Sequence, residues 1–261
     1  MSHQTISTGV TARGIATVTL NRPERGNALN QTMLDELAGQ FEAWGSDAKV
    51  RVVVLRGAGR NFCAGADVGA PQPETSKSPG VKPANLVELA MALDALPKPT
   101  LALVHGACIG GGLAMTACCD VALADEGAFF SIPEARLGFA ATALLPVFVR
   151  AIGYRNFRRY GLSGERIGSA EALRIGLVHQ LVTAATADEV LAGLADAMLH
   201  SAPGSLRDFK AAAARYVTPD LASLPLADLE AKFHRSRSSE EAIEGIASFR
   251  EKRKPNWYPA P

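Results

Sequence analysis

Two glycine-rich segments have the residue types needed to hold an anion with backbone N–H groups. The first, residues 57–67 (GAGRNFCAGAD), contains Ala64-Gly65-Ala66, whose N–H groups can be exposed in a turn. The second, Gly110-Gly111-Gly112, opens a predicted helix that runs through Ala117. A helix start presents unsatisfied N–H donors and the positive end of the helix dipole. Together the segments could form a two-donor oxyanion hole, although the same glycines could equally serve only tight turns and close packing.

A carboxylate follows a proline in a third segment, Pro133-Glu134. Taken alone, this glutamate is most simply the N-terminal charge of a helix, where it interacts favourably with the dipole. If the segment is extended, Arg136, two residues further on, would form a surface or structural ion pair. The segment therefore offers one candidate acid/base group.

Neither glycine-rich segment matches a nucleotide-binding fingerprint. Residues 57–67 lack the Lys-Ser/Thr ending of a P-loop, and residues 110–112 lack G-x-G-x-x-G spacing, which disfavours ATP and NAD. The five histidines form no i, i+4 pair and the four cysteines show no C-x-x-C spacing, so we expect no metal. With ATP and NAD also disfavoured, we expect no separate cofactor. Buried free thiols are expected at Cys63, Cys108, Cys118 and Cys119.

The elements that position these segments alternate between strands and helices. Apolar alternation and β-branched residues predict strands at 14–20, 50–56, 100–104 and 121–124. Helical spacing predicts helices at 31–44, 86–96, 169–176, 187–200, 205–216 and 240–251. This order predicts an α/β core followed by a tail that is wholly helical over its last sixty or so residues. The proline-rich stretch 69–83 predicts a mobile surface loop.

The composition excludes several classes of protein. With 261 residues, 48% of them hydrophobic, the chain can bury a sizeable core. The 27 Lys and Arg residues nearly balance the 26 Asp and Glu residues, so no overall positive field exists to hold nucleic acid. The longest apolar runs, such as 140–149, fall short of the roughly 20 residues of a membrane span, and residues 1–9 carry no apolar signal segment. We therefore expect a cytoplasmic protein with no nucleic-acid or membrane partner.

Five segments occur in the order and at the separations that resemble the crotonase (enoyl-CoA hydratase/isomerase) superfamily. They are residues 21–29 (NRPERGNAL), 62–67 (FCAGAD), 105–112 (HGACIGGG), 119–120 (CD) and 130–138 (FSIPEARLG). The resemblance extends through 170–178 to 249–255, nearly the whole chain. It implies an α/β fold with a crotonase-like spiral core of ββα units, residues 1–200, and a C-terminal helical region, residues 201–261. It also implies homotrimers, commonly paired into hexamers, whose substrate is an acyl-CoA thioester.

The resemblance assigns roles to particular residues. The N–H groups of Ala66 and Gly111 match the family's oxyanion hole, and Glu134 matches one of the two glutamates that flank the acyl chain in its hydratases. The other glutamate is absent, because the matching position is Ala114. The residues that match CoA contacts are Arg25, the backbone at Ala28, Ala64 and Asp67, and Ala66. Phe249 and Lys252 match a pair that would reach the CoA of an adjacent subunit. Arg22 could also serve the nucleotide end of CoA or be an ordinary surface charge.

The alanine at position 114 leaves several functions open. One group of bacterial hydratases, acting on 3-methylglutaconyl-CoA and similar thioesters, resembles the chain most in residues 130–138 and also lacks that glutamate; Arg136 or another arginine could then bind the substrate's distal carboxylate. Isomerases that move a double bond from the 3- to the 2-position can use one glutamate at the Glu134 position. A non-catalytic acyl-CoA or RNA binder is the alternative of another class. We expect a lyase that hydrates a 2-enoyl-CoA.

Overall fold

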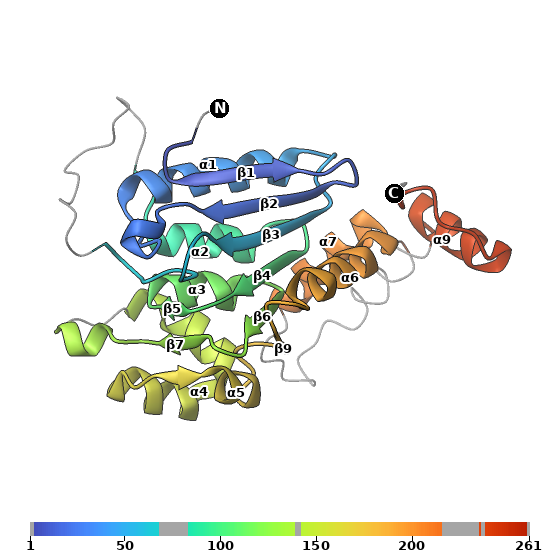
Figure 1. The fold of residues 1–261 in the computed structure, drawn as a ribbon. Coiled ribbons are helices and arrows are strands. Elements are labelled where there is room, and N and C mark those ends of the chain that lie inside the picture. Colours follow the sequence, from blue (N-terminus) through green and yellow to red (C-terminus); the bar gives the residue numbers. More distant parts are fainter. Residues whose placement is uncertain (1–2, 68–82, 139–141, 216–234, 236–237, 260–261) are drawn as a thin grey trace.

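The computed structural model describes residues 3–67, 83–138, 142–215, 235 and 238–259. A six-stranded sheet runs through the molecule in the order β1-β2-β3-β4-β6-β9 (Figure 1). Its members are β1 (Ile6–Val10), β2 (Ile15–Leu20), β3 (Val52–Gly57), β4 (Thr100–Val104), β6 (Val121–Asp125) and β9 (Gln180–Val182). Only the β1–β2 pair is antiparallel, and the other neighbours in this sheet are parallel. The predicted α/β class is confirmed.

The burial of each strand follows from its sequence. β4 is buried along its whole length, as expected for a parallel strand covered on both faces. β2 alternates buried and half-buried residues. β1, which was not predicted, is the edge strand of this sheet and buries only Ile6.

A second layer of short strands lies beside the large sheet. It contains β5 (Ala107–Ile109), β7 (Phe129–Ser131) and β8 (Ile167–Gly168). Two isolated parallel bridges, Cys63 with Cys108 and Leu29 with Ala66, extend this layer. The chain therefore repeats one path: a strand of the large sheet, a short segment in the second layer, then a helix. The helices that close these turns are α1 (Gln31–Ser46), α2 (Leu86–Asp94), α3 (Gly111–Cys118) and α4 (Leu145–Ser163).

Apolar side chains fill both sides of the large sheet. The main core contains Met33, Leu37 and Phe41 of α1, all at most 1% exposed. On the other face, Leu191, Ala195 and Leu199 of α6 (Ala187–His200) pack in a smaller cluster with residues of β3, β4 and β6. The four cysteines are free and buried, as predicted, and burial raises the pKa of the Cys63 thiol to about 12. The small helix α5 (Ser169–Arg174) packs near the end of β7 and β8.

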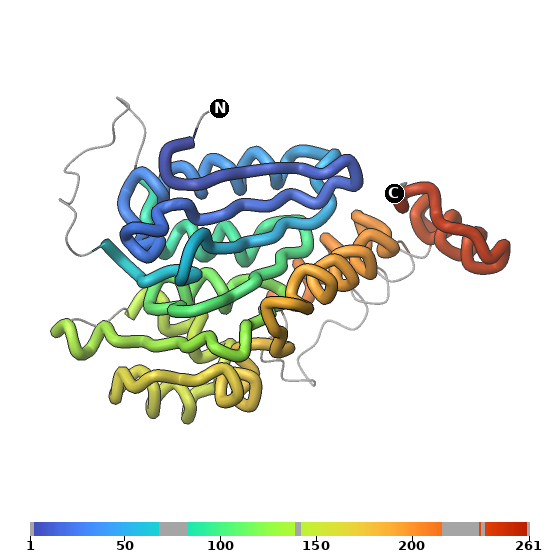
Figure 2. The backbone as a smooth tube through the Cα atoms, in the orientation of Figure 1, coloured from blue at the N-terminus to red at the C-terminus, as the bar shows by residue number. Residues whose placement is uncertain are grey.

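The described C-terminal helices bury few side chains. No residue of α7 (Pro203–Arg215) is fully buried, and α9 (Glu240–Glu251) buries only Ser248. Figure 2 shows α9 and the segment after it at the opposite end of the molecule from α4. The prediction of a wholly helical tail is wrong for residues 252–259, which form no helix. There Trp257 Nε1 donates to His200 O at 2.9 Å and Tyr258 Oη to Asp196 at 2.6 Å, so aromatic side chains fasten this end to α6.

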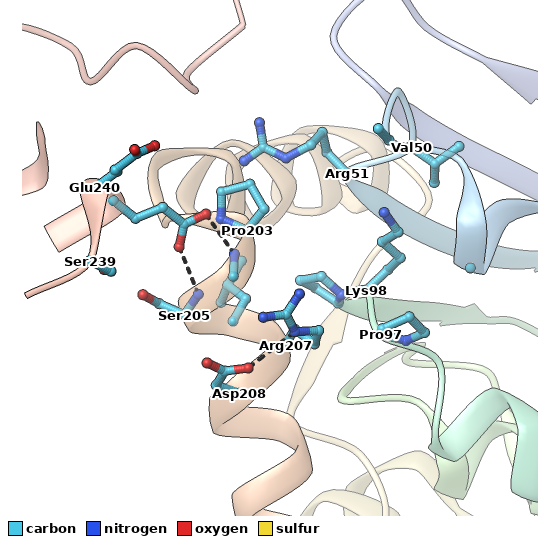
Figure 3. Close-up of a pocket in the computed structure, with 16 residues that line it drawn as sticks. Val50, Arg51, Pro97, Lys98, Pro203, Ser205, Arg207, Asp208, Ser239 and Glu240 are labelled. Atoms are coloured by element: carbon cyan, nitrogen blue, oxygen red, sulfur yellow. Dashed lines mark hydrogen bonds and ion pairs between the residues drawn. The ribbon is translucent and has the colours of Figure 1, made fainter. Parts of the chain in front are cut away.

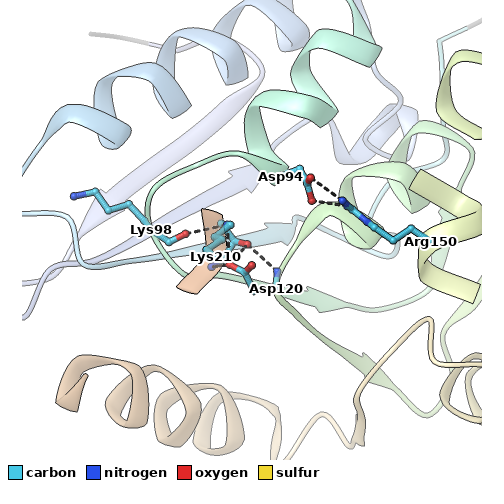
Figure 4. A network of polar contacts seen from close by, with 6 residues as sticks. Asp94, Lys98, Asp120, Arg150 and Lys210 are labelled. Carbon is cyan, nitrogen blue, oxygen red and sulfur yellow. Dashed lines mark hydrogen bonds and ion pairs between the residues drawn. The ribbon is translucent and has the colours of Figure 1, made fainter. Parts of the chain in front are cut away.

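A polar network joins α7 to the sheet. Lys210 Nζ donates to Asp120 Oδ2 at 2.8 Å and to Lys98 O at 3.1 Å (Figure 4). The same Asp120 oxygen accepts the backbone and hydroxyl donors of Thr100, at 2.8 and 2.9 Å. Asp120 directly precedes β6 and Lys98 lies two residues before β4, so this network lies at the N-terminal ends of the parallel strands. None of the described helices is long and apolar enough to cross a membrane.

Candidate active site

The start of α3 supplies backbone donors. Gly110 precedes the helix with φ 51° and ψ −112°, a conformation that favours glycine, and it offers no capping side chain. The Ala114 N–H donates to Gly110 O at 2.9 Å, which closes the first turn. The N–H groups of Gly111, Gly112 and Leu113 therefore have no acceptor within the helix. They are available for an anion at the positive end of the dipole.

The second donor segment lies beside the first. Leu29 N donates to Gly65 O at 2.8 Å and Asp67 N donates to Leu29 O at 2.9 Å. In this parallel bridge the N–H of the middle residue, Ala66, points away from Leu29. A Cβ on Gly65, whose φ is 93°, would lie 3.2 Å from the oxygen of Ile109, the residue before Gly110. The two segments selected from the sequence are thus neighbours in space.

Glu134 reaches the same place from the second layer. It is the first residue of a short 3₁₀ helix, η2 (Glu134–Leu137), which follows β7. A Cβ on Gly110 would lie only 2.6 Å from Glu134 Oε1. Gly110 N also donates to Ser131 O at 3.0 Å, which ties the two segments together. The structure therefore brings Ala66, Gly111 and Glu134 together.

The environment of the Glu134 carboxyl suits proton transfer. Its Oε2 is buried and has no hydrogen-bond partner among the described residues. Burial raises the pKa of this carboxyl, and the residue's own backbone N–H opposes the shift. A carboxyl with a raised pKa and an unused oxygen can accept and return a proton near neutral pH more readily than an ordinary surface glutamate.

Ala114 lies in the first turn of α3 and is fully buried. Its methyl group offers no donor or acceptor, so position 114 cannot hold water or move a proton. Of the four residues Ala66, Gly111, Ala114 and Glu134, Glu134 alone has an ionisable side chain.

Two leucines form an apolar wall beside the donors. A Cβ on Gly111 would lie 2.7 Å from Leu29 Cδ1 and 2.8 Å from Leu86 Cδ2. Because the Cα–Cβ bonds of a helix tilt toward its N-terminus, these side chains lie near the free N–H groups. An apolar wall strengthens the interaction of backbone dipoles with a developing charge.

The arginine of the first matched segment is tied into the fold. Arg22 pairs with Asp67 at 2.9 Å, and the two side chains are 14% and 8% exposed. Its other nitrogen donates to Ala28 O at 2.6 Å. The Ala64 N–H donates to Gly26 O at 2.9 Å. Arg25, in contrast, is exposed at the end of the 3₁₀ helix η1 (Pro23–Arg25).

Other candidate residues lie away from this group. Phe249 is 85% exposed near the end of α9, and Lys252 caps that helix with φ 53°. Within one chain, α9 stands apart from α3 and β7 (Figure 1). The segment of Arg136 is not extended but 3₁₀-helical, and Arg136 Nε donates to Ser163 O at 2.8 Å. The predicted loop at 69–83 lies almost wholly outside the described residues.

A cavity of about 770 Å³ lies elsewhere, between α7, α9 and the start of β3 and β4 (Figure 3). Arg51, Lys98 and Arg207 contribute to its lining, as do Glu240 and Glu241. The Glu241 carboxylate accepts from Gly204 N at 2.8 Å and Ser205 N at 3.1 Å, which satisfies donors at the start of α7. This cavity was not predicted, because its wall residues come from four separate stretches of the chain, within 45–51, 97–99, 203–208 and 239–241. With Asp208, three carboxylates balance the three cationic side chains, so the cavity is a polar contact region between the C-terminal helices and the rest of the chain.

Comparison with known proteins gives one consistent result. The family described as enoyl-CoA hydratase/isomerase matches residues 10–259. The 2,3-dehydroadipyl-CoA hydratase of Escherichia coli K12 is 32% identical over 243 residues, covering 92% of this chain and 93% of that protein. The mevalonyl-coenzyme A hydratase sidH of Aspergillus fumigatus is 31% identical over 258 residues, covering 94% and 92%.

Solved structures agree with the sequence relatives. An enoyl-CoA hydratase from Shewanella pealeana superimposes with a TM-score of 0.88 at 31% identity, covering 97% of this chain and 96% of the other. AtuE of Pseudomonas aeruginosa gives a TM-score of 0.87 at 32% identity, covering 98% and 100%. The spiral arrangement of strand, short segment and helix is therefore shared with these structures.

Proposed function

Because the chain belongs to the enoyl-CoA hydratase/isomerase family and is an enzyme of that class with an acyl-CoA substrate, we propose that it hydrates a 2-enoyl-CoA. In this proposal Glu134 moves the proton, and the N–H groups of Ala66 and Gly111 hold the thioester oxygen. The observation that carries it is the Glu134 carboxyl, which lies against Gly110 with one buried oxygen that has no hydrogen-bond partner in the described part of the chain.

The chemistry follows from these three groups. The two N–H groups polarise the thioester carbonyl, so the Glu134 carboxylate can take a proton from water as the water oxygen bonds to C3. The electron pair of the C2–C3 double bond moves onto the thioester oxygen as an enolate. Glu134 then returns its proton to C2, which completes the addition of water. Each backbone donor contributes about 3 to 4 kcal/mol in comparable oxyanion holes.

Within this proposal, the 2-enoyl-CoA substrate is a glutaconyl-type thioester, which carries a second carboxylate at the far end of its acyl chain. The proposal is supported by the E. coli relative, which is named as a 2,3-dehydroadipyl-CoA hydratase. The distal carboxylate requires a cation, and Arg22 and Arg136 already hold partners within the fold. Arg22 is committed to Asp67 and Ala28, whereas the exposed Arg136 uses its Nε alone in the contact with Ser163. Arg136 or another cationic group would therefore bind the carboxylate if this substrate is correct, and a comparison of substrates tests the point directly.

Isomerisation of a 3-enoyl-CoA is the second candidate, and Ala114 is the observation that favours it. Moving the double bond requires one base to take a proton from C2, giving a dienolate on the thioester oxygen, and to return it to C4. A single carboxyl can do both, and no water has to be held. Glu134 would serve this reaction without help from position 114.

The trimer or hexamer remains part of the proposal. On the C-terminal helices Ile243 is 63% exposed, Phe209 76% and Phe249 85% in the single chain. Exposed apolar residues grouped on one region favour burial against another protein surface. In such an assembly Phe249 and Lys252 would approach the CoA of a neighbouring subunit. In this arrangement Phe249 and Lys252, which lie far from Glu134 of their own chain, would contribute to the site of a neighbouring subunit.

One assay panel tests the proposed function. Purified protein is incubated with crotonyl-CoA, 3-methylglutaconyl-CoA and a 3-enoyl-CoA, and the products are identified by mass and chromatography. Water addition to either of the first two supports the hydratase, and conversion of the third alone makes the isomerase correct. Glu134→Gln should lose at least about 100-fold in turnover, because an amide cannot exchange the proton. Undiminished turnover would remove Glu134 from the mechanism, and binding without turnover of any substrate would indicate a non-catalytic acyl-CoA binder.

A further inference from the structure

The turn from Arg22 to Ala28 touches both ends of the segment that carries Ala66. At one end, the Asn27 side chain donates from Nδ2 to Ala58 O and to Asn61 O, each at 2.8 Å. At the other end, Arg22 pairs with Asp67 at 2.9 Å, one residue beyond Ala66. The backbone donor segment is thus held at its start and its finish by one turn.

Both polar groups of the Asn27 side chain, its amide nitrogen and its oxygen, form hydrogen bonds with neighbouring backbone groups. It is fully buried, and its φ of 57° places it in the left-handed region that asparagine tolerates better than most residues. Its Oδ1 accepts from Arg22 N at 2.8 Å, while both amide hydrogens are committed to the carbonyls described above. A buried polar side chain with every contact satisfied specifies one local geometry.

The turn is also connected to the second donor. Asn61, which Asn27 holds, accepts from Ala107 N at 3.1 Å through its Oδ1. Cys63 N donates to Ala107 O at 3.0 Å, and Ile109 N donates to Cys63 O at 2.9 Å. Ala107–Ile109 is β5, and β5 leads directly into Gly110 and the start of α3. Contacts therefore run from Asn27 to the segment of Gly111 as well as to that of Ala66.

We infer that the turn 22–28 is a positioning clamp that sets the Ala66 N–H relative to the Gly111 N–H, with Asn27 and Arg22 as its positioning residues. The inference rests on the proposed function, because it presumes that these donors hold a thioester oxygen. In this inference Arg22 helps to fix the geometry of the oxyanion hole, because the two terminal nitrogens of its guanidinium donate to Ala28 O and to Asp67. An oxyanion hole rewards such rigidity, because misplacing a donor by about 1 Å can cost on the order of 100-fold in rate.

The test compares two CoA esters of equal acyl length. Acetoacetyl-CoA loses a C2 proton to give a delocalised enolate whose absorbance reports its formation, whereas butyryl-CoA offers the same CoA and no stable enolate. Dissociation constants for both esters are measured by calorimetry for the wild type and for Arg22→Met, Asp67→Asn, Asn27→Asp and Asn27→Gly. Asn27→Gly keeps the left-handed backbone conformation at position 27, and Asp67→Asn keeps the shape of the side chain at position 67. We therefore expect at least these two variants to fold and to be available for comparison.

We expect the wild type to bind acetoacetyl-CoA more tightly than butyryl-CoA. The variants should reduce this preference by about 10-fold or more, while the butyryl-CoA constant changes by less than about 3-fold, because the donors act on the enolate charge. Lys210→Met is the matched control: it breaks a part-buried ion pair at the other end of the sheet and should leave the preference unchanged.

Each contrary result has one meaning. An unchanged preference in folded Arg22 and Asn27 variants overturns the clamp and leaves the proposed function intact. An equal loss of affinity for both esters also overturns it, because the turn would then contact CoA directly. If the wild type binds neither ester, the proposed function fails, and the clamp fails with it.

Discussion

Glu134 and Gly110 are in direct contact: a Cβ on Gly110 would lie 2.6 Å from Glu134 Oε1. The absent side chain at position 110 is the space that the carboxyl occupies. Because Gly110 also precedes the first free N–H of α3, the contact fixes the proposed acid/base group beside a proposed oxyanion donor. The short distance has consequences for activity, for pH dependence and for stability.

Gly110→Ala should reduce turnover by at least about 10-fold, because the new methyl group collides with the Glu134 carboxyl and an L-residue is strained at φ 51°. The measurement is kcat on the best substrate of the panel. Gly39→Ala is the matched control, since Gly39 lies in the middle of α1 with nothing within 4 Å of its Cβ position. That variant should keep full activity and gain about 0.5 to 1 kcal/mol in unfolding free energy. Equal activity of the two variants would contradict the contact.

The pH dependence of kcat/KM should show an acidic limb governed by Glu134. Burial raises the pKa of this carboxyl above the ordinary value of about 4.3. The base must be ionised to accept a proton, so activity rises with pH through that pKa and reaches a plateau above it. A profile of the wild type from pH 4 to pH 8 checks this expectation. A limb centred at or below the ordinary glutamate value would be evidence against burial of the carboxyl.

Glu134→Gln should stabilise the protein at neutral pH. A carboxyl whose folded-state pKa is raised binds its proton more tightly in the folded state, so its ionisation destabilises the fold as pH rises through that pKa. The amide removes this penalty, so the melting temperature of the variant should exceed that of the wild type at pH 8. The difference should shrink toward zero at about pH 3, below the ordinary pKa of about 4.3, where the wild-type carboxyl is protonated in both states. A constant difference across this range would show that its cause is not ionisation.

Local sequence was enough to predict elements with strong periodicity or clear ends. The helices α6 and α9 begin and end at the predicted residues, and α9 has a serine cap, Ser239, whose side chain accepts from Ala242 N. β5 and β7 were not predicted, because three-residue strands are defined by their partners. α4 was missed for a different reason: Gly153, with φ 76°, interrupts it.

The sequence predicted which types of residue form the candidate site. The family resemblance predicted which individual residues belong to it. Nothing local in the sequence shows that Arg22 pairs with Asp67, which lies 45 residues away. From the sequence alone, Arg22 could equally have been a surface charge. The raised pKa of Glu134 also required the fold, because burial is produced by segments distant in sequence. Long-range packing therefore determined the contacts and burial of the candidate residues, while local sequence determined which residues were candidates.

Asp120→Ala should destabilise the chain more than Lys210→Met. Asp120 accepts from Lys210 and also from both donors of Thr100, so its removal leaves the fully buried Thr100 with two unsatisfied donors. Each costs about 1 to 3 kcal/mol, whereas Lys210→Met breaks a part-exposed pair. Chemical denaturation of the two single variants and the double variant measures both costs and their coupling. Equal losses in the single variants would mean that Thr100 finds other acceptors.

Ile243→Lys should shift the protein toward smaller assemblies. Ile243 lies on α9 and is 63% exposed in the single chain, so a lysine there costs little within one subunit but places a charge in a proposed subunit interface. Light scattering coupled to size-exclusion chromatography, over a range of concentrations, measures the mass of the wild type and the variant. Met91→Lys is the matched control, because Met91 on α2 is equally exposed at 63% and lies outside the C-terminal helices. A trimeric or hexameric mass for the wild type that Ile243→Lys lowers and Met91→Lys preserves supports the interface. The same mass for all three proteins would exclude this face of α9 from the assembly.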